Sequence, residues 1–507
     1  MTARRYSIDA PPRLTATDTS LTANVATVSG GAIAATGIVN RFNAAGQPLP
    51  PLKPRVSLTS STLSANACPG GDGGAIAASD TDVTIESSTM VANSAADGGT
   101  ARLEGCTLVV NATDVSLSNA TTRGGALSLH GGTALVTACT FASNAVVVVG
   151  NASSGGGGGD GGDDVASEGG ALLLNQTENA RVERTNLTAN SAGYGGAIAA
   201  VSAPDVAIEG CDLSANAATE GAAVYSSAST VDVTSSSLSS NEATGGGGGV
   251  CGLDGTALTL TGATLADNVC RECNGGGVML SRSRLTSTSS TFARNVGALG
   301  GGAYLWDKMG GAEPSFTSST FLENAAVPTA AQEGGEGGAL YLYSAGAPTG
   351  TGCVFDANSA LDGGALGVVA NTALSLVGST LRANTASRNG GALAVTLASL
   401  SSSSNVYLNN SAASGGAAYL LSAQATIGGG DRFEANAVTS SGGALLASSS
   451  QATIADVSVA GNVAQAAGGG LACVTSSRAA VSNATFHDNH ATSGGAVSVQ
   501  VCVRQPT

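Results

Sequence analysis

An asparagine returns along the chain at a nearly constant interval, and this periodicity constrains the fold more than any other feature of the sequence. The recurring residues are Asn24, Asn66, Asn93, Asn119, Asn144, Asn190, Asn216, Asn241, Asn268, Asn295, Asn324, Asn358, Asn384, Asn410, Asn436, Asn462 and Asn489. Twelve of the sixteen intervals between them measure 25 to 27 residues. Periods of this size are typical of solenoids and propellers. We therefore expect stacked copies of one structural unit.

A Gly-Gly-Ala-apolar string lies between successive asparagines, as at Gly390–Leu393. The apolar residues that follow it alternate, for example Leu393 with Val395 and Val497 with Val499. A period of two indicates a strand with one buried face, whereas a helix would place apolar residues three and four apart. A unit of about 26 residues with two or three short strands is typical of one solenoid coil. The sequence thus predicts an all-β, single-stranded parallel β-solenoid of about 17 coils.

Each recurring residue type has a physical role in such a coil. The residue three positions before the asparagine is apolar in every coil except at Ser116, and six of the eight phenylalanines lie there, which predicts one buried column. Asparagine tolerates the left-handed conformation of a bend, and stacked amides can hydrogen-bond along the column. Paired glycines allow a tight corner and a close approach of neighbouring coils.

The irregular intervals locate insertions in a single solenoid. We expect an N-terminal extension over residues 1–13, the solenoid over 14–503 and a C-terminal tail over 504–507. Loop insertions are predicted near 41–55, 146–168, 307–314 and 325–336, where Pro, Gly or charged residues interrupt the period.

The charge balance restricts the partners. The chain has 20 Lys and Arg against 35 Asp and Glu, a net charge of −15, which disfavours nucleic acid and anionic membrane surfaces. No apolar run approaches the length of a membrane-spanning helix, so no transmembrane segment is expected. The first residues also lack the apolar stretch of a signal peptide. Either the protein stays inside the cell or the chain is a piece of a longer one.

The alternation of Gly-Gly-Ala-(Ile/Leu/Val) and Phe-x-x-Asn strings resembles the passenger repeats of chlamydial polymorphic outer-membrane proteins. It is also similar to other right-handed parallel β-helix repeats. Phe141–Asn144, Phe292–Asn295, Phe321–Asn324 and Phe433–Asn436 match this pattern closely. The resemblance covers residues 14–500 and implies a right-handed β-helix at the cell surface or outside the cell, often adhesive. From the sequence we expect no C-terminal amphipathic-strand domain of the kind that could form an outer-membrane barrel.

Polar and aromatic residues gather between Asn268 and Asn358. The candidate ligand-binding residues are Met279, Arg282, Arg284, Asp307, Lys308, Tyr341 and Tyr343. Counted from the alanine position, Met279 and Tyr341 should face outward and Trp306 inward, with Arg282 and Lys308 stacked on neighbouring coils. A glycan or a cell-surface protein could bind there; the alternative interpretation is a set of scattered surface side chains.

The cysteines give little indication of a functional site. Cys139, Cys211 and Cys353 lie in phase with the buried apolar position and are expected to act as small buried hydrophobes. The Cys270-Arg-Glu-Cys273 string is expected to hold unpaired turn thiols, with a local disulfide or a labile metal site as the alternatives.

An enzyme of the pectate-lyase-like class, either a polysaccharide lyase or a glycoside hydrolase, would need clustered acidic side chains on adjacent coils. No pair of aspartates aligns across the coils of the candidate patch, and we assign no catalytic residue, metal or cofactor. The sequence therefore favours a non-enzymatic surface scaffold or adhesion protein.

Overall fold

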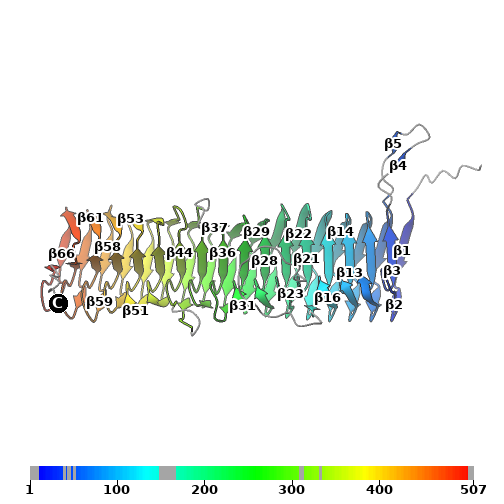
Figure 1. Ribbon diagram of the computed structural model, residues 1–507, viewed down its shortest axis with the longest axis horizontal. Helices are drawn as coiled ribbons and strands as arrows, with labels where there is room; N and C mark the ends of the chain where they lie inside the picture. The colour runs from blue at the N-terminus through cyan, green and yellow to red at the C-terminus, as the bar shows by residue number, and fades with distance from the viewer. Residues whose placement is uncertain are drawn as a thin grey trace, which may run out of the picture. The chain divides into compact units, whose positions relative to one another are not determined.

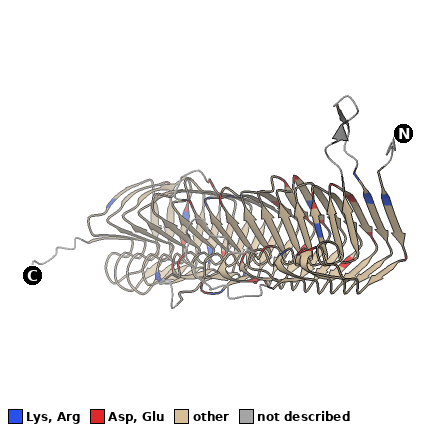
Figure 2. Cartoon of the chain, turned by 45° about the vertical axis from the view of Figure 1, so that its right-hand side comes forward, with Lys and Arg blue, Asp and Glu red and all other residues tan. Residues whose placement is uncertain are grey.

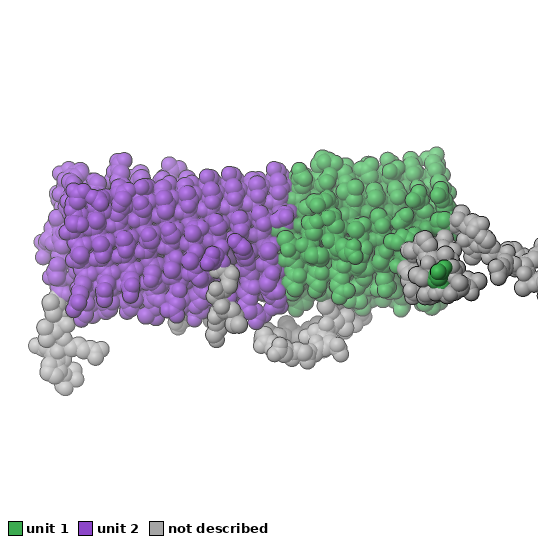
Figure 3. All heavy atoms as spheres, turned by 90° about the horizontal axis from the view of Figure 1, so that it is seen from above, with its two compact units in different colours: residues 1–218, 222–231 green, residues 219–221, 232–507 purple. Residues whose placement is uncertain are grey.

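The computed structural model describes residues 11–37, 41–42, 47–49, 53–147, 167–307, 313–329 and 334–500. These residues form strands from β1 (Arg13–Thr17) to β67 (Val497–Gln500) and no helix, so none of them forms a helix that could span a membrane (Figure 1). The chain divides into two compact units (Figure 3). Unit 1 comprises residues 1–218 and 222–231, and unit 2 comprises residues 219–221 and 232–507.

Each coil contributes one strand to each of three parallel sheets, here called A, B and D. In unit 1, sheet A runs from β1 to β25 (Val206–Glu209) and sheet B from β2 (Ser20–Thr22) to β26 (Asp212–Ser214). In unit 2, sheet A runs from β33 (Ala257–Thr261) to β65 (Arg478–Ser482) and sheet B from β30 (Ser237–Ser239) to β66 (Thr485–His487). Some coils add a short strand between sheets B and D, such as β12 (Ser94–Asp97).

Sheet D carries the candidate site. In unit 1 it contains β3 (Ile33–Thr36), β9 (Ile76–Ser79), β13 (Ala101–Glu104), β17 (Leu127–His130), β21 (Leu172–Asn175), β24 (Ile198–Val201) and β28 (Val224–Ser227). In unit 2 it contains β32 (Val250–Leu253), β36 (Val278–Ser281), β40 (Ala303–Trp306), β44 (Leu340–Tyr343), β48 (Leu366–Val369), β52 (Leu393–Thr396), β56 (Ala418–Leu421), β60 (Leu445–Ser448), β64 (Leu471–Val474) and β67. The seven coils of unit 1 and the ten coils of unit 2 confirm the predicted parallel β-solenoid. The right-handed sense of its winding stays a prediction.

A ladder of buried asparagines joins consecutive coils at the bend after sheet B. The Oδ1 atom of Asn190 accepts hydrogen bonds from the backbone N–H and the Nδ2 of Asn144, both at 3.0 Å. The Nδ2 of Asn190 donates in turn to Asn216 Oδ1 at 3.1 Å and to the Phe141 carbonyl at 3.0 Å. In unit 2 the same pattern runs without interruption from Asn241 to Asn489.

Two expectations about this ladder are wrong. The left-handed residue of the bend is the one before the asparagine, for example Ala189 with φ +54°, because the asparagine must aim its amide into the ladder. Asn119 is exposed and is not a member, or rung, of the ladder. Ser118 takes its place, because it is buried and donates its N–H to Asn144 Oδ1. The residue three before Ser118 is Val115, which is buried. The apparent exception at Ser116 therefore disappears.

The predicted roles of the glycine pairs and the phenylalanine column are confirmed. In the pair Gly98-Gly99, Gly98 has φ +68° and a Cβ on Gly99 would lie 2.1 Å from the Gly125 carbonyl oxygen of the next coil. In the column, the Phe292 and Phe355 rings stack on Phe321 at centroid distances of 4.7 and 4.8 Å.

A second ladder lies at the bend between sheets A and B, and it explains three cysteines. Cys139, Cys211 and Cys353 are buried, as predicted. Their thiols also form hydrogen bonds, in places of the ladder where other coils have a hydroxyl side chain such as Thr185. Cys139 Sγ donates to the carbonyls of Thr137 and Val110, at 3.1 and 3.6 Å, and its N–H donates to Thr185 Oγ1. Burial raises the pKa of Cys211 to about 11, so this thiol is unreactive at neutral pH.

Asp431 occupies the same ladder in unit 2 and is fully buried. Its Oδ1 accepts the Asn405 N–H at 2.6 Å, while its Oδ2 has no hydrogen-bond partner among the described residues. Burial raises the pKa of this carboxyl. In the preceding coil, Asn405 Nδ2 donates to the Leu376 carbonyl at 2.8 Å.

Most of the predicted insertions fall partly outside the described residues. The segment near 41–55 contains the antiparallel pair β4 (Arg41–Phe42) and β5 (Pro48–Leu49). In the predicted insertions near 146–168, 307–314 and 325–336, residues 148–166, 308–312 and 330–333 lie outside the description, as do residues 1–10 of the predicted extension and the tail 504–507.

Removing one rung of the asparagine ladder should destabilise the protein strongly. We expect Asn190→Ala to lower the free energy of unfolding by about 3 kcal/mol, because it leaves the buried amide of Asn144 without an acceptor. Asn186→Ala, at an exposed position four residues earlier, serves as the control. Urea unfolding followed by circular dichroism measures both, and equal losses would contradict the prediction.

Asp431→Asn should stabilise the protein at neutral pH. A raised folded-state pKa means that the group's stabilising contribution is present below the unfolded-state value of about 4 and is lost as the pH rises through the folded-state value. The asparagine can donate to the Ser402 carbonyl as Asn405 does one coil earlier. We expect a gain of about 1–3 kcal/mol at pH 7 that vanishes near pH 3. Urea midpoints at the two pH values measure it; a pH-independent difference would refute the explanation.

Candidate functional site

Tyrosine and tryptophan side chains are concentrated on the outer face of sheet D, whereas most phenylalanines lie in the core. Of the described tyrosines, Tyr194 and Tyr225 in unit 1 and Tyr304, Tyr341, Tyr343 and Tyr419 in unit 2 lie on or beside this face; Tyr407 is the exception and is buried in the core. By contrast, the central outward column of sheet A in unit 2 carries Thr259, Thr286, Ser315, Thr349 and Ser375. The face of sheet D is therefore chemically distinct.

The outward side chains of β36, β40 and β44 form two adjacent columns. Met279, Tyr304 and Tyr341 share one register position, and Ser281, Trp306 and Tyr343 share the next. The rings of Tyr304 and Tyr341 are stacked, with centroids 5.6 Å apart and planes 8° from parallel. We call Met279, Tyr304, Trp306, Tyr341 and Tyr343 the aromatic patch.

Packing fixes the patch in place. Tyr341 is only 8% exposed, because its ring lies between Tyr304 and Gly367, where an added Cβ would be 3.0 Å from the ring. Burial raises the pKa values of Tyr304 and Tyr341, so both remain protonated phenols. Tyr343 is 37% exposed and Trp306 is half-buried. The patch thus offers a rigid, partly exposed aromatic surface.

Trp306 faces outward, and its predicted inward orientation is wrong. Three glycines precede this strand, and Gly300, with φ +60°, is the first of the pair that makes the corner. Gly302 therefore takes the place that alanine has in other coils. A count that starts from Ala303 is off by one residue, and it assigns Trp306 to the wrong side of the strand. By the same register, Arg282 follows Ser281, the partner of Trp306, and so lies beside Asp307. The stacking of Arg282 on Lys308 stays a prediction. Lys308 itself lies outside the described residues.

The other predicted residues are distributed over different surroundings. Met279, Tyr341 and Tyr343 come together in the patch. Arg282 is exposed and is paired with Asp254, and Asp307 is buried next to the patch at the end of β40. Arg284 begins β37 (Arg284–Thr288) in sheet A, on a different face. Tyr304 escaped the sequence analysis because of the triple glycine.

A pair of carboxylates that the sequence analysis missed borders the patch. Glu336 and Asp362 each precede a glycine pair and are bridge partners on adjacent coils. Burial and the charge of Asp362 raise the pKa of Glu336. Asp362 is paired with Arg388 and accepts two hydrogen bonds from Asn389 at 3.0 Å. An acidic residue before a glycine pair was the available signal in the sequence.

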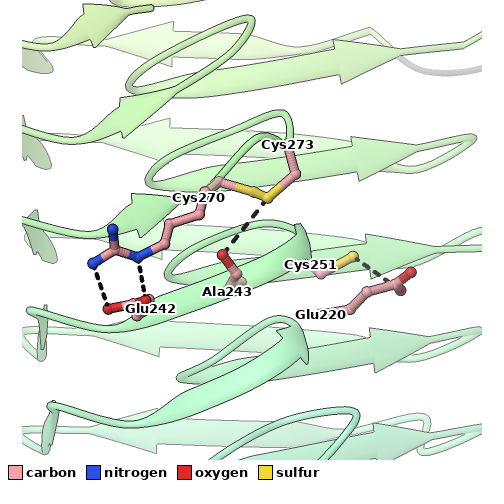
Figure 4. Close-up of a disulfide and its surroundings, with 7 residues drawn as sticks. Glu220, Glu242, Ala243, Cys251, Cys270 and Cys273 are labelled. Carbon is pink, nitrogen blue, oxygen red and sulfur yellow. Dashed lines mark hydrogen bonds and ion pairs between the residues drawn. A yellow bond between two sulfur atoms is a disulfide. The ribbon is translucent and has the colours of Figure 1, made fainter. Parts of the chain in front are cut away.

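Cys270 and Cys273 form a disulfide, which corrects the expectation of unpaired thiols (Figure 4). The turn after β35 (Val269–Cys270) brings their Cα atoms within 5.1 Å, a distance that a disulfide spans. Cys251 remains a buried thiol whose Sγ lies 3.7 Å from Glu220 Oε2, and burial raises its pKa well above the usual value. Neither feature provides a reactive thiolate.

Metal ligands do not gather in the described part of the chain: no three His, Cys, Asp or Glu side chains there could hold one ion together. The sequence matches no known family model, and it matches no curated protein. The geometry of the patch and its surroundings is thus the basis for a functional assignment.

Proposed function

We propose that this protein is a β-solenoid scaffold that binds glycans through the aromatic patch. The observation that carries the proposal is the stacked pair Tyr304–Tyr341 beside the partly exposed Trp306 and Tyr343. Aromatic rings offer a broad apolar face with little conformational entropy to lose, and the Tyr and Trp polar atoms can still form hydrogen bonds. Such a surface fits the C–H face of a sugar ring, and the carboxylates of Glu336 and Asp362 can accept hydrogen bonds from its hydroxyls.

The same proposal includes an extracellular or cell-surface location and a role in adhesion. Its support is the resemblance of the repeats to surface-displayed passenger domains. Charged residues also make up only 11% of the chain and are sparse along the ribbon (Figure 2). Glycans and cell-surface proteins are the partners that such a location would offer.

Removing the exposed rings should weaken glycan binding without unfolding the protein. We expect the double variant Trp306→Ala/Tyr343→Ala to lower the affinity for a bound glycan at least tenfold, about 1.4 kcal/mol, because each ring loses its stacking contact. A glycan array identifies the ligand, and calorimetry measures its affinity.

Arg284→Ala is the matched control, since this side chain is exposed but lies on sheet A. If no glycan binds the wild-type protein, or if the double variant binds as tightly as the control, the proposed function fails.

The carboxylate pair favours glycoside hydrolysis as a second candidate function. Retaining glycosidases use two carboxyl groups about 5 Å apart, one protonated and one ionised. The backbones of bridge partners on adjacent coils are about 4.8 Å apart, so Glu336 and Asp362 occupy neighbouring places in one column. Glu336, with its raised pKa, would be the acid, and Asp362, paired with Arg388, would be the nucleophile.

Release of reducing ends from a panel of polysaccharides tests this candidate. Turnover by the wild-type protein should fall by a factor of about 10² to 10⁴ in Glu336→Gln, which keeps the shape but removes the proton. Absence of turnover by the wild-type protein, or full activity of the variant, would exclude Glu336 and Asp362 as a hydrolytic pair.

A further inference from the structure

Three buried polar atoms without hydrogen-bond partners gather on the sheet D face of unit 1. They are Asp97 Oδ1, Ser128 Oγ and His130 Nε2, half of all such side-chain atoms in the described residues. Ser128 and His130 lie two residues apart on β17 and so point to the same side. Asp97 ends β12 in the preceding coil, in register with Arg123. Unsatisfied buried polar atoms are costly, so three in one place require an explanation.

The charges around this cluster nearly compensate one another. The Oδ2 atom of Asp97 lies 3.5 Å from Arg102 Nε, 3.5 Å from Arg123 Nη2 and 3.7 Å from His130 Nε2. Arg102 also pairs with Asp72 and Glu104 on its outer side. The Asp97 side chain is only 8% exposed. The Asp97 carboxylate would repel an anionic ligand, and the guanidinium groups of Arg102 and Arg123 would repel a cationic one.

His130 is neutral in these surroundings. Burial and the charge of Arg102 lower its pKa, although Asp97 opposes the shift. A neutral imidazole and a serine hydroxyl can each donate or accept a hydrogen bond, whereas the Asp97 carboxylate can only accept. An uncharged group that carries several hydroxyls can satisfy all three atoms.

An aromatic pair continues the same face. Arg123, Glu168 and Tyr194 are bridge partners on successive coils, and the Tyr194 ring lies 5.0 Å from that of Tyr225. Polar groups that accept hydroxyls and an adjacent aromatic surface together resemble the composition of the patch in unit 2.

We propose that Asp97, Ser128 and His130 form a binding subsite for a neutral sugar. This inference rests on the proposed function, glycan binding, and assigns it a second site and an uncharged ligand. The sugar hydroxyls donate to Asp97 Oδ1 and exchange hydrogen bonds with Ser128 Oγ and His130 Nε2. The His130 side chain is 19% exposed whereas Ser128 is fully buried, so contact of the sugar with Ser128 requires the imidazole ring to move aside.

Histidine NMR tests the subsite directly, because the chain has only three histidines. The protein, labelled on its imidazole rings, is titrated with cellohexaose, xylohexaose, mannohexaose and hexagalacturonate. We expect at least one neutral hexasaccharide to shift the His130 signals, while the exposed His487 and His490 stay unchanged as internal controls. Ser128→Ala should weaken this response at least tenfold. Alanine fits there, since Ala77 and Ala199 occupy the same column.

The outcomes separate this inference from the proposed function. Trp306→Ala/Tyr343→Ala should leave the His130 response intact. If no neutral sugar shifts His130, if hexagalacturonate alone does so, or if Ser128→Ala responds like the wild type, the subsite is refuted even where the aromatic patch binds glycans. If neither the patch nor His130 responds to any glycan, both proposals fail.

Discussion

The amide ladder at the bend after sheet B is the interaction on which the rest of the solenoid depends. Each rung satisfies a buried backbone N–H and a buried side-chain amide of the preceding coil, as Asn216 does for Asn190. Such a rung requires a sharp bend immediately before it, which the left-handed residue supplies, and a fixed distance to the next coil, which the glycine pairs permit. The hydrophobic column fills the interior that these polar contacts define.

Most of this architecture could be predicted from the sequence, because the residues that determine it recur at a regular interval. One asparagine every 26 residues is visible without coordinates, and so are the glycine pairs and the phenylalanines three residues away from the asparagines. The errors arose where two residues satisfy the same local pattern. Asn119 follows Ser118, and either can accept a backbone hydrogen bond, so only burial distinguishes the rung from its neighbour. In Gly300–Gly302, three glycines can supply a pair in two ways, and φ decides between them.

The functional face was predictable only in part, for a related reason. Tyrosine and tryptophan are rare enough in this chain for their clustering to be noticed, and Met279, Tyr341 and Tyr343 were identified. Glu336 with Asp362, and Asp97 with His130, depend on alignment between coils of unequal length, so a one-residue error in register hides them. The raised pKa of Glu336 and the lowered pKa of His130 also come from burial by neighbours that are distant in sequence.

Two neighbouring strands of sheet A, β57 (Gln424–Gly428) and β61 (Gln451–Ala455), begin with the same four residues, Gln-Ala-Thr-Ile. These residues are paired with one another in direct register. Because successive coils such as those of Asn436 and Asn462 present the same asparagine to both neighbours, such a coil is an interchangeable part of the stack. Unequal crossing-over in the gene could insert or delete a coil and still leave every remaining rung paired. The separation between two binding surfaces on one unit can thus evolve in steps of about 4.8 Å, without any change to the surfaces themselves.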